Sequence, residues 1–155
     1  MTAALNEDER RELVRQALLA RRKAYAPYSG YYVGAALLCD DGSIYHGVNV
    51  ENASSPAGIC AERSAFASAV SDGKTGFRAI AVAGGLGTDA SPDSPMAYPC
   101  GICRQVISEL CPDTFEIIAA DISGRYSVYT IRELLPLSFR LKTNEKTAQE
   151  QTLVR

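Results

Sequence analysis

Residues 31–50, YYVGAALLCDDGSIYHGVNV, decide the kind of sheet that this chain forms. The nearly unbroken apolar run over residues 31–39 is typical of a strand that is buried on both faces. Asp40-Asp41-Gly42 then predicts a tight hairpin turn. Residues 43–50 return as the antiparallel partner, so the sequence predicts a β-hairpin whose first strand lies in the interior.

Helical patterns flank this hairpin. Asn6 followed by Glu9 predicts a helix start, and apolar residues at helical spacing predict an amphipathic helix over residues 7–25. After the hairpin we expect two further long helices, three strands and a short helix. They are the helices over residues 60–71 and 101–110, the strands over 78–83, 115–122 and 126–130, and the short helix over 131–135.

Two details of this pattern can be tested by a structure. The helix over residues 101–110 is expected to bury Ile102, Val106 and Leu110, which lie four residues apart. Residues 84–99 are rich in Gly, Ser, Asp and Pro, which predicts a long exposed loop.

The order of the elements predicts an α/β fold. Strand–helix–strand connections require a sheet that is at least partly parallel, with helices on its faces. A length of 155 residues suits one domain. We therefore predict a single domain over residues 1–139, followed by a polar tail over residues 140–155.

The composition restricts the possible partners. The net charge is −2 and the pI is about 5.4, which excludes the basic face that a long nucleic acid needs. No apolar run approaches the roughly 18 residues of a membrane span. The chain has five cysteines, an odd number, and no recognisable signal peptide, which favours reduced thiols and a cytoplasmic location.

Two short cysteine-bearing stretches carry the chemistry, CAER at residues 60–63 and PCGICRQ at residues 99–105. Both lie where a strand or loop passes into a predicted helix, and a helix start favours thiolate over thiol. Three protein ligands are the number that a catalytic zinc uses when its fourth position holds water. The candidate ligands are Cys60, Cys100 and Cys103.

The other metal-ligating side chains are expected to take no part. Cys39 and Cys111 are interpreted as small apolar core residues. His46 is the only histidine in the chain, and we expect it to point to solvent and to have no role in the site.

Glu62 tests whether the site is catalytic. Residues two apart in a regular helix point about 200° apart, so Cys60 and Glu62 can share a site only if the helix begins within a residue or two of Cys60. A water beside Glu62 then gives a nucleophile and a proton carrier. The alternatives are a structural zinc site or reduced core cysteines, with Glu62 stabilising the helix dipole.

Two arginines follow the cysteine motifs. Arg63 is interpreted as a hydrogen-bond donor to the coordinating sulfurs. Arg104 is either a similar donor or an ordinary surface charge.

Six short pieces of sequence occur in a characteristic order. They are APYS at 26–29, VGAAL at 33–37, NVENA at 49–53, CAER at 60–63, PCGICRQV at 99–106, and LLP at 134–136 followed by Phe139. In these pieces the chain resembles the cytidine deaminase family in its small homotetrameric form, from about Tyr25 to Phe139. The resemblance implies a three-layer α/β/α sandwich around a mixed five-stranded sheet.

The resemblance also implies a reaction. One Zn²⁺ per subunit would be held by the three cysteines named above. Glu62 would take a proton from the zinc-bound water and pass it to N3 of the pyrimidine and then to the departing amine. Cytidine and 2′-deoxycytidine would yield uridine and 2′-deoxyuridine with release of ammonia, a step of pyrimidine salvage.

The resemblance further implies a nucleoside pocket. Asn49 and Glu51 would bind the ribose hydroxyls, since Asn can donate and Glu accepts. Ala61 would contact the substrate and Tyr31 would line the base pocket, while Phe139 would reach a neighbouring subunit's site in a homotetramer with sites near subunit interfaces. Tyr31 and Phe139 also have a plain core-packing interpretation. The partner is then a small nucleoside, with no polynucleotide and no membrane.

The sequence departs from the family pattern at two places. Tyr31-Tyr32 stands where Phe-Pro or a similar pair is usual, and Ser54-Ser55-Pro56 stands where Ser-Tyr is common. Two other functions stay open at this point. One is deamination of a modified cytosine nucleoside such as blasticidin S, and the other is that of a non-catalytic zinc-stabilised binding protein, for example one that binds RNA.

Overall fold

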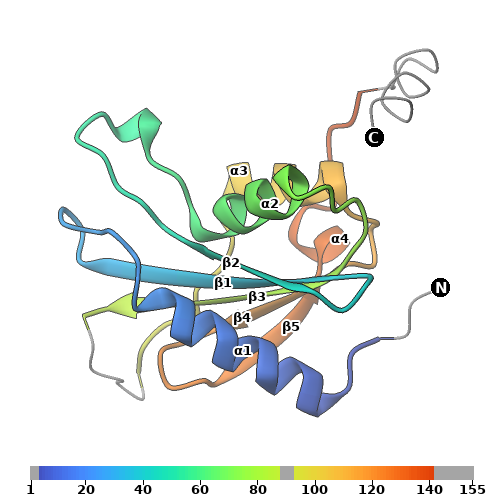
Figure 1. The fold of residues 1–155 in the computed structure, drawn as a ribbon, viewed down its shortest axis with the longest axis horizontal. Helices are drawn as coiled ribbons and strands as arrows, with labels where there is room; N and C mark the ends of the chain where they lie inside the picture. The colour runs from blue at the N-terminus through green and yellow to red at the C-terminus, as the bar shows by residue number, and fades with distance from the viewer. Residues whose placement is uncertain (1–3, 88–92, 142–155) are drawn as a thin grey trace.

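A computed structural model of the chain describes residues 4–87 and 93–141 (Figure 1). Its centre is a five-stranded sheet with the strand order β2-β1-β3-β4-β5. Strands β3 and β4 are parallel, whereas the other neighbouring pairs are antiparallel. The sheet is therefore mixed, as predicted. The strands are β1 (Tyr31–Cys39), β2 (Ile44–Val48), β3 (Phe77–Leu86), β4 (Glu116–Ala120) and β5 (Tyr126–Thr130).

Helices cover both faces of the sheet and give three layers (Figure 1). Helix α1 (Glu7–Arg21) lies on one face. The other face carries α2 (Ala61–Ser71), α3 (Gly101–Leu110) and α4 (Ile131–Leu134), with a 3-10 turn, η1 (Ser55–Ala57), in the loop before α2. Each face has its own apolar core. The predicted three-layer α/β/α fold is confirmed.

Two glycines of the hairpin let helices lie directly on its backbone. A Cβ at Gly34 would lie 2.0 Å from Ala17 O of α1, and a Cβ at Gly47 would lie 2.1 Å from Ala61 O of α2. A Cβ at these distances would overlap with the backbone of the helix, so glycine is required at both positions. The contact at Gly47 fixes the first turn of α2, which carries Glu62, against the sheet.

Helix α1 begins as predicted but ends early. Asn6 and Glu9 form the expected capping box, with Asn6 Oδ1 accepting from the Glu9 N–H at 2.9 Å. The helix ends at Arg21 rather than at residue 25. Tyr25 leaves it because its N–H donates to Asn49 O at 3.0 Å, which places this part of the chain beside the end of β2.

Strand β3 runs into the segment predicted as a loop. It pairs with β1 as far as Leu86, so the loop prediction over residues 84–99 is wrong at its start. The physical reason is packing: a Cβ at Gly85 would lie 2.7 Å from the Cγ2 atom of Ile122, so glycine lets that side chain cover the strand. Residues 88–92 of the predicted loop lie outside the described residues.

Helix α3 has the predicted bounds but the opposite orientation. Ile102 is 61% exposed and Leu110 is also exposed, whereas Cys103, Ile107 and Ser108 are buried. The prediction that Ile102, Val106 and Leu110 form the core stripe is wrong. Because Cys103 faces the other two predicted ligands, the helix is rotated and its apolar stripe faces outward.

The C-terminal segment is attached to α3 and to the loop that follows α3, as far as the structure describes it. Gln105 Nε2 donates to Phe139 O at 2.8 Å, and Arg140 Nη2 lies 2.8 Å from Asp113 Oδ1. Residues 142–155 of the predicted tail lie outside the described residues. None of the helices in residues 4–87 and 93–141 is long and apolar enough to cross a membrane.

Candidate active site

Two of the predicted ligands are the residues at which helices begin. Cys60 is the N-cap of α2 and Cys100 the N-cap of α3, each with extended backbone (φ −79°, ψ 155° and φ −69°, ψ 171°). The helix therefore starts where the sharing of one site by Cys60 and Glu62 requires, as predicted. Cys103 lies three residues after Cys100, on the same side of α3.

The three sulfur atoms form one cluster. The Sγ atoms of Cys60, Cys100 and Cys103 all lie within 4.8 Å of one another, and those of Cys60 and Cys100 are 3.7 Å apart. A tetrahedral zinc with Zn–S bonds of about 2.3 Å needs sulfurs roughly 3.8 Å apart. Among residues 4–87 and 93–141 this group of possible ligands consists of the three sulfurs, which is the number of protein ligands in a catalytic zinc site.

The electrostatics of the cluster favour a cation. The adjacent Cys103 thiol is the main cause that lowers the pKa of Cys60 to about 5; Cys100 and the Arg63 guanidinium also lower it, while burial acts in the opposite direction. The pKa of Cys103 is strongly raised, by its interaction with Cys60 and by burial. The protein alone therefore stabilises one thiolate readily, and a divalent cation supplies the charge that three thiolates need.

Glu62 is a buried carboxyl group in the first turn of α2. It is 4% exposed, and burial raises its pKa to about 7. A carboxyl group with this pKa can hold or release a proton near neutral pH, which is the property of a general acid and base.

One cavity of about 290 Å³ joins the cysteine cluster to the predicted substrate contacts. Four of the five predicted substrate residues line it, together with Cys60, Cys100 and Glu62; the four are Tyr31, Asn49, Glu51 and Ala61. A second hollow of about 590 Å³ continues outward past Asn49, Glu51 and Ser55. Phe139 lines neither cavity; it is 66% exposed on the segment that follows α4.

Asn49 is held by the backbone of the strand that forms the cavity wall. Its Oδ1 accepts from the Val33 N–H at 2.8 Å, and its Nδ2 donates to Tyr31 O at 2.8 Å. One N–H of the amide is not used by these two bonds. Asn49 therefore both shapes the wall and offers a donor to a ligand.

The two arginines differ in what they contact. Burial would lower the pKa of Arg63, but the sulfurs of Cys60 and Cys103 beside it raise it. This placement agrees with the predicted donor to the coordinating sulfurs. Arg104 instead donates to Pro99 O and to Leu134 O, both at 2.8 Å, so it ties the residue before Cys100 to the end of α4.

Sequence reasoning missed five residues of the cavity wall. They are Ser29, Val33, Val82, Ala97 and Tyr98. Ser29 lies in the piece APYS and Val33 in the piece VGAAL, so the family resemblance could have indicated both residues. Ala97 and Tyr98 belong to residues 84–99, so part of that segment reaches the cavity.

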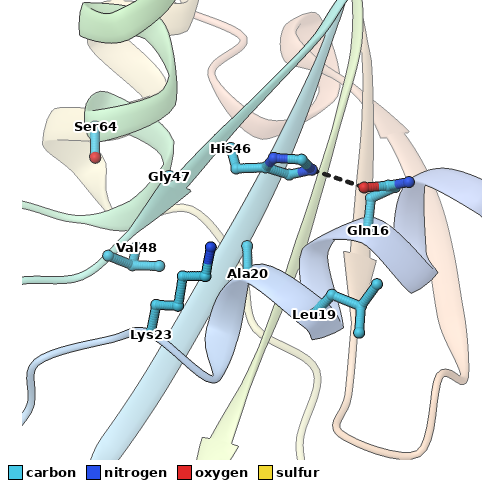
Figure 2. Close-up of a pocket in the computed structure, with 8 residues that line it drawn as sticks. All are labelled: Gln16, Leu19, Ala20, Lys23, His46, Gly47, Val48 and Ser64. Atoms are coloured by element: carbon cyan, nitrogen blue, oxygen red, sulfur yellow. Dashed lines mark hydrogen bonds between the residues drawn. The ribbon is translucent and has the colours of Figure 1, made fainter.

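A separate groove of about 530 Å³ lies between α1 and β2 (Figure 2). Among the residues that the structure describes, no thiol, no carboxylate and none of the predicted site residues lines it. The described wall is Gln16, Leu19, Ala20, Lys23, His46, Gly47, Val48 and Ser64. His46 is exposed, as predicted, and its Nε2 is 2.7 Å from Gln16 Oε1. The cysteine cluster and Glu62 line the smaller cavity instead.

Comparisons with known proteins agree with this geometry. The family model described as the cytidine and deoxycytidylate deaminase zinc-binding region matches residues 7–119. A cytidine deaminase of Sporosarcina psychrophila is 44% identical over 128 residues, which cover 83% of this chain and 89% of that protein. The crystal structure of a cytidine deaminase from Burkholderia pseudomallei is 42% identical, with a TM-score of 0.76, and the match covers 87% of this chain and all of that one.

A further relative bears on the choice of substrate. A blasticidin-S deaminase of Bacillus cereus is 36% identical over 110 residues, which cover 70% of this chain and 77% of that protein. The match to the cytidine deaminases is both closer and longer. The three-sulfur cluster, the carboxyl group buried beside it and these matches lead to one conclusion: the chain belongs to the cytidine deaminase family of zinc-dependent enzymes.

Proposed function

We propose that the chain catalyses the hydrolytic deamination of cytidine and 2′-deoxycytidine to uridine and 2′-deoxyuridine, with release of ammonia. The observation that carries this proposal is that Glu62, a buried carboxyl group, lines the same cavity as Cys60 and Cys100 of the three-sulfur cluster. In the reaction the C4–N bond of the base breaks and a C4–O bond to a water oxygen forms.

Cys60, Cys100 and Cys103 would hold one Zn²⁺ per subunit, which would acidify a water molecule for attack on the base. Glu62 would accept a proton from the attacking water, because burial raises the pKa of its carboxyl group to about 7 and it lines the same cavity. Glu62 then donates this proton to N3 of the pyrimidine. Once the water oxygen is bonded to C4, Glu62 takes the remaining proton of that hydroxyl group and passes it to the departing amine, which leaves as ammonia. Arg63 lowers the negative charge on the sulfurs from outside the cluster.

The sugar is bound at the outer side of the same cavity. Asn49 offers one N–H and Glu51 offers carboxylate oxygen, so together they suit a hydroxyl group, which both accepts and donates. Tyr31 and Ala61 line the region between the sugar subsite and the cysteines, where the base lies.

Cytidine is favoured over blasticidin S as the substrate. An ordinary ribose offers the hydroxyl that Asn49 and Glu51 require. Ammonia release from the two compounds under the same conditions separates the two functions: turnover of blasticidin S without turnover of cytidine would reverse the assignment.

We further propose a homotetramer with its sites near the subunit interfaces. Large apolar side chains lie uncovered on α3 and on the segment after α4, among them Ile102 (61% exposed), Phe139 (66%) and Leu137 (94%). In such an assembly Phe139 reaches the cavity of a neighbouring subunit. The five free cysteines suit a reducing compartment, the cytoplasm, and the reaction a role in pyrimidine salvage.

The decisive experiment measures zinc content and conversion of cytidine to uridine on the same sample. We expect about one zinc ion per subunit and turnover that a chelator abolishes and added zinc restores. Zinc-loaded protein that turns over neither cytidine nor 2′-deoxycytidine would exclude the proposed function.

A further inference from the structure

Ser29 joins two of the predicted substrate contacts. Its hydroxyl donates to Glu51 Oε1, and its Oγ accepts from the Tyr31 N–H at 3.0 Å. Ser29 also lines the cavity that contains Cys60 and Glu62. One short side chain therefore connects the carboxylate of the sugar subsite to the strand that forms the base side of the wall.

The backbone around Ser29 holds the second oxygen of the same carboxylate. The N–H groups of Tyr28 and Ser29 donate to Glu51 Oε2 at 2.9 and 3.2 Å. The turn is itself fixed, since the Gly30 N–H donates to Ala26 O at 3.0 Å with Gly30 at φ +66°. These bonds lower the pKa of Glu51, and the Ser29 hydroxyl is the largest cause.

The hydrogen bonds leave a defined set of free positions. An ionised carboxylate accepts about four hydrogen bonds. The Ser29 hydroxyl takes one on Oε1 and two N–H groups take both positions on Oε2, so one acceptor position of Glu51 remains. Asn49, which lines the same cavity, retains one N–H. One acceptor and one donor match a single hydroxyl group of a sugar.

We propose that Ser29 is a positioning residue for sugar recognition: its hydroxyl fixes the orientation of the Glu51 carboxylate so that one acceptor faces the substrate. The inference rests on the proposed function. Ser29 lies on the sugar side and contacts neither the sulfurs nor Glu62 in any hydrogen bond of the described residues. Its loss therefore weakens binding equally in the ground and transition states, which raises KM and leaves kcat nearly unchanged.

The test compares Ser29→Ala and Ser29→Thr with the wild type, all loaded with zinc. Ser43→Ala is the matched control, because the Ser43 hydroxyl also donates to a carboxylate, that of Asp41 at 2.6 Å, in a hairpin turn away from the cavity. For cytidine, Ser29→Ala is expected to raise KM about tenfold and to change kcat less than about threefold. Ser29→Thr, which keeps the hydroxyl, and Ser43→Ala are expected to stay within about twofold of the wild type.

A merely structural role is separated by coupling to Glu51. In a Glu51→Ala background, adding Ser29→Ala is expected to change kcat/KM for cytidine less than about twofold, because the carboxylate to be positioned is gone. For 2′,3′-dideoxycytidine, which lacks both ring hydroxyls, Ser29→Ala alone is expected to have the same small effect. Ser29→Gly replaces Ser29→Ala throughout if the latter does not fold.

The outcomes are distinct. A wild type that does not deaminate cytidine overturns the proposed function, and this inference with it. A wild type that does so, together with an unchanged KM in Ser29→Ala, overturns the inference alone. The inference is also overturned if Ser29→Ala loses as much kcat/KM with 2′,3′-dideoxycytidine as with cytidine. Additive losses of kcat/KM in the Ser29→Ala, Glu51→Ala double variant overturn it as well.

Discussion

The sulfur atoms of Cys60 and Cys100 lie 3.7 Å apart, although 40 residues separate them in the chain. Each cysteine is the N-cap of its helix, so the distance is set by where α2 and α3 begin rather than by long side chains. Two helix N-termini also face the cluster, and their partial positive charges stabilise thiolates. The metal centre is thus a consequence of how the two helices are packed on the sheet.

Replacement of Cys100 tests the metal site without disturbing the core. Cys100 is exposed, so Cys100→Ser is expected to lower bound zinc to less than about a tenth per subunit. It should change the free energy of unfolding of the metal-free protein by no more than about 0.5 kcal/mol, as for other surface substitutions. Zinc analysis and urea unfolding measure the two effects.

Cys111→Ser is the matched control. Cys111 is buried outside the cluster, so this change is expected to cost about 1–3 kcal/mol of stability through an unpaired buried hydroxyl, with zinc content retained. Full zinc occupancy in Cys100→Ser would contradict the assignment of the ligands.

Glu62→Gln tests the proton carrier. The amide keeps the size of the side chain but carries no titrating proton, so kcat is expected to fall at least about 10³-fold. Zinc content and thermal midpoint should stay near those of the wild type. Glu109→Gln on the exposed side of α3 is the control and should leave kcat unchanged. If the protein only binds its ligand and does not catalyse the reaction, Glu62→Gln should have no more effect than Glu109→Gln in the deamination assay.

Gly47→Ala tests whether the sheet positions α2. The added Cβ would lie 2.1 Å from Ala61 O and 2.4 Å from Ala65 N, so the helix must move. We expect a loss of about 2 kcal/mol or more in stability and weaker zinc binding. At Gly101, the first residue of α3, an added Cβ meets no atom within 4 Å, so Gly101→Ala should bind zinc normally. Zinc affinity is measured by competition with a chelator. Equal affinity in both variants would show that α2 accommodates the added methyl group at position 47 without disturbing the zinc site.

The bounds of most elements could be predicted from the sequence, because turn and cap residues mark them. The Asp40-Asp41-Gly42 turn forms, with Gly42 at φ +85°, and Cys60 begins its helix as its spacing to Glu62 required. The length of strand β3 was underestimated because Gly84 and Gly85 resemble loop residues. In the structure Ile122, which is distant in sequence, covers Gly85, and Val33 and Ala97 lie against Gly84. A local pattern does not contain those contacts.

The candidate site was predicted unevenly for a similar reason. Cysteine spacing identifies ligands because metal geometry constrains the residue type. The role of Ser29 depends on the Glu51 carboxylate, which lies 22 residues away in sequence, so no spacing rule reveals it. The outward stripe of α3 was misjudged because the periodicity of an apolar stripe does not tell whether the stripe faces the core or the surface of the subunit.

Asp121 predicts how stability depends on pH. Its side chain is fully buried; burial alone would raise the pKa of Asp121, but bonds from Ser123 Oγ at 2.6 Å and Arg125 Nε at 2.9 Å, with two backbone N–H groups, lower it. Asp121→Asn is expected to cost about 2 kcal/mol at pH 7. A lowered pKa gives stability that is complete above the ordinary Asp value of about 3.9 and is lost as pH falls through the folded-state pKa.

The difference between wild type and Asp121→Asn should therefore be constant from pH 7 to about 4.5 and shrink below about pH 4. Urea unfolding of the metal-free proteins across this range measures it without interference from zinc release. A difference that grows as the pH falls would mean that the carboxylate destabilises the fold.

Leu137→Asp tests the proposed homotetramer. Leu137 is 94% exposed, so a charge there leaves the subunit's own packing intact but disfavours burial against another copy. We expect smaller species in sedimentation velocity and an unchanged zinc content. Leu86→Asp, at a 67% exposed apolar position at the end of β3, is the control and should keep the wild-type assembly. If Phe139 completes a neighbouring cavity, dissociation by Leu137→Asp should also raise KM for cytidine, and this rise should diminish at protein concentrations that restore the assembly.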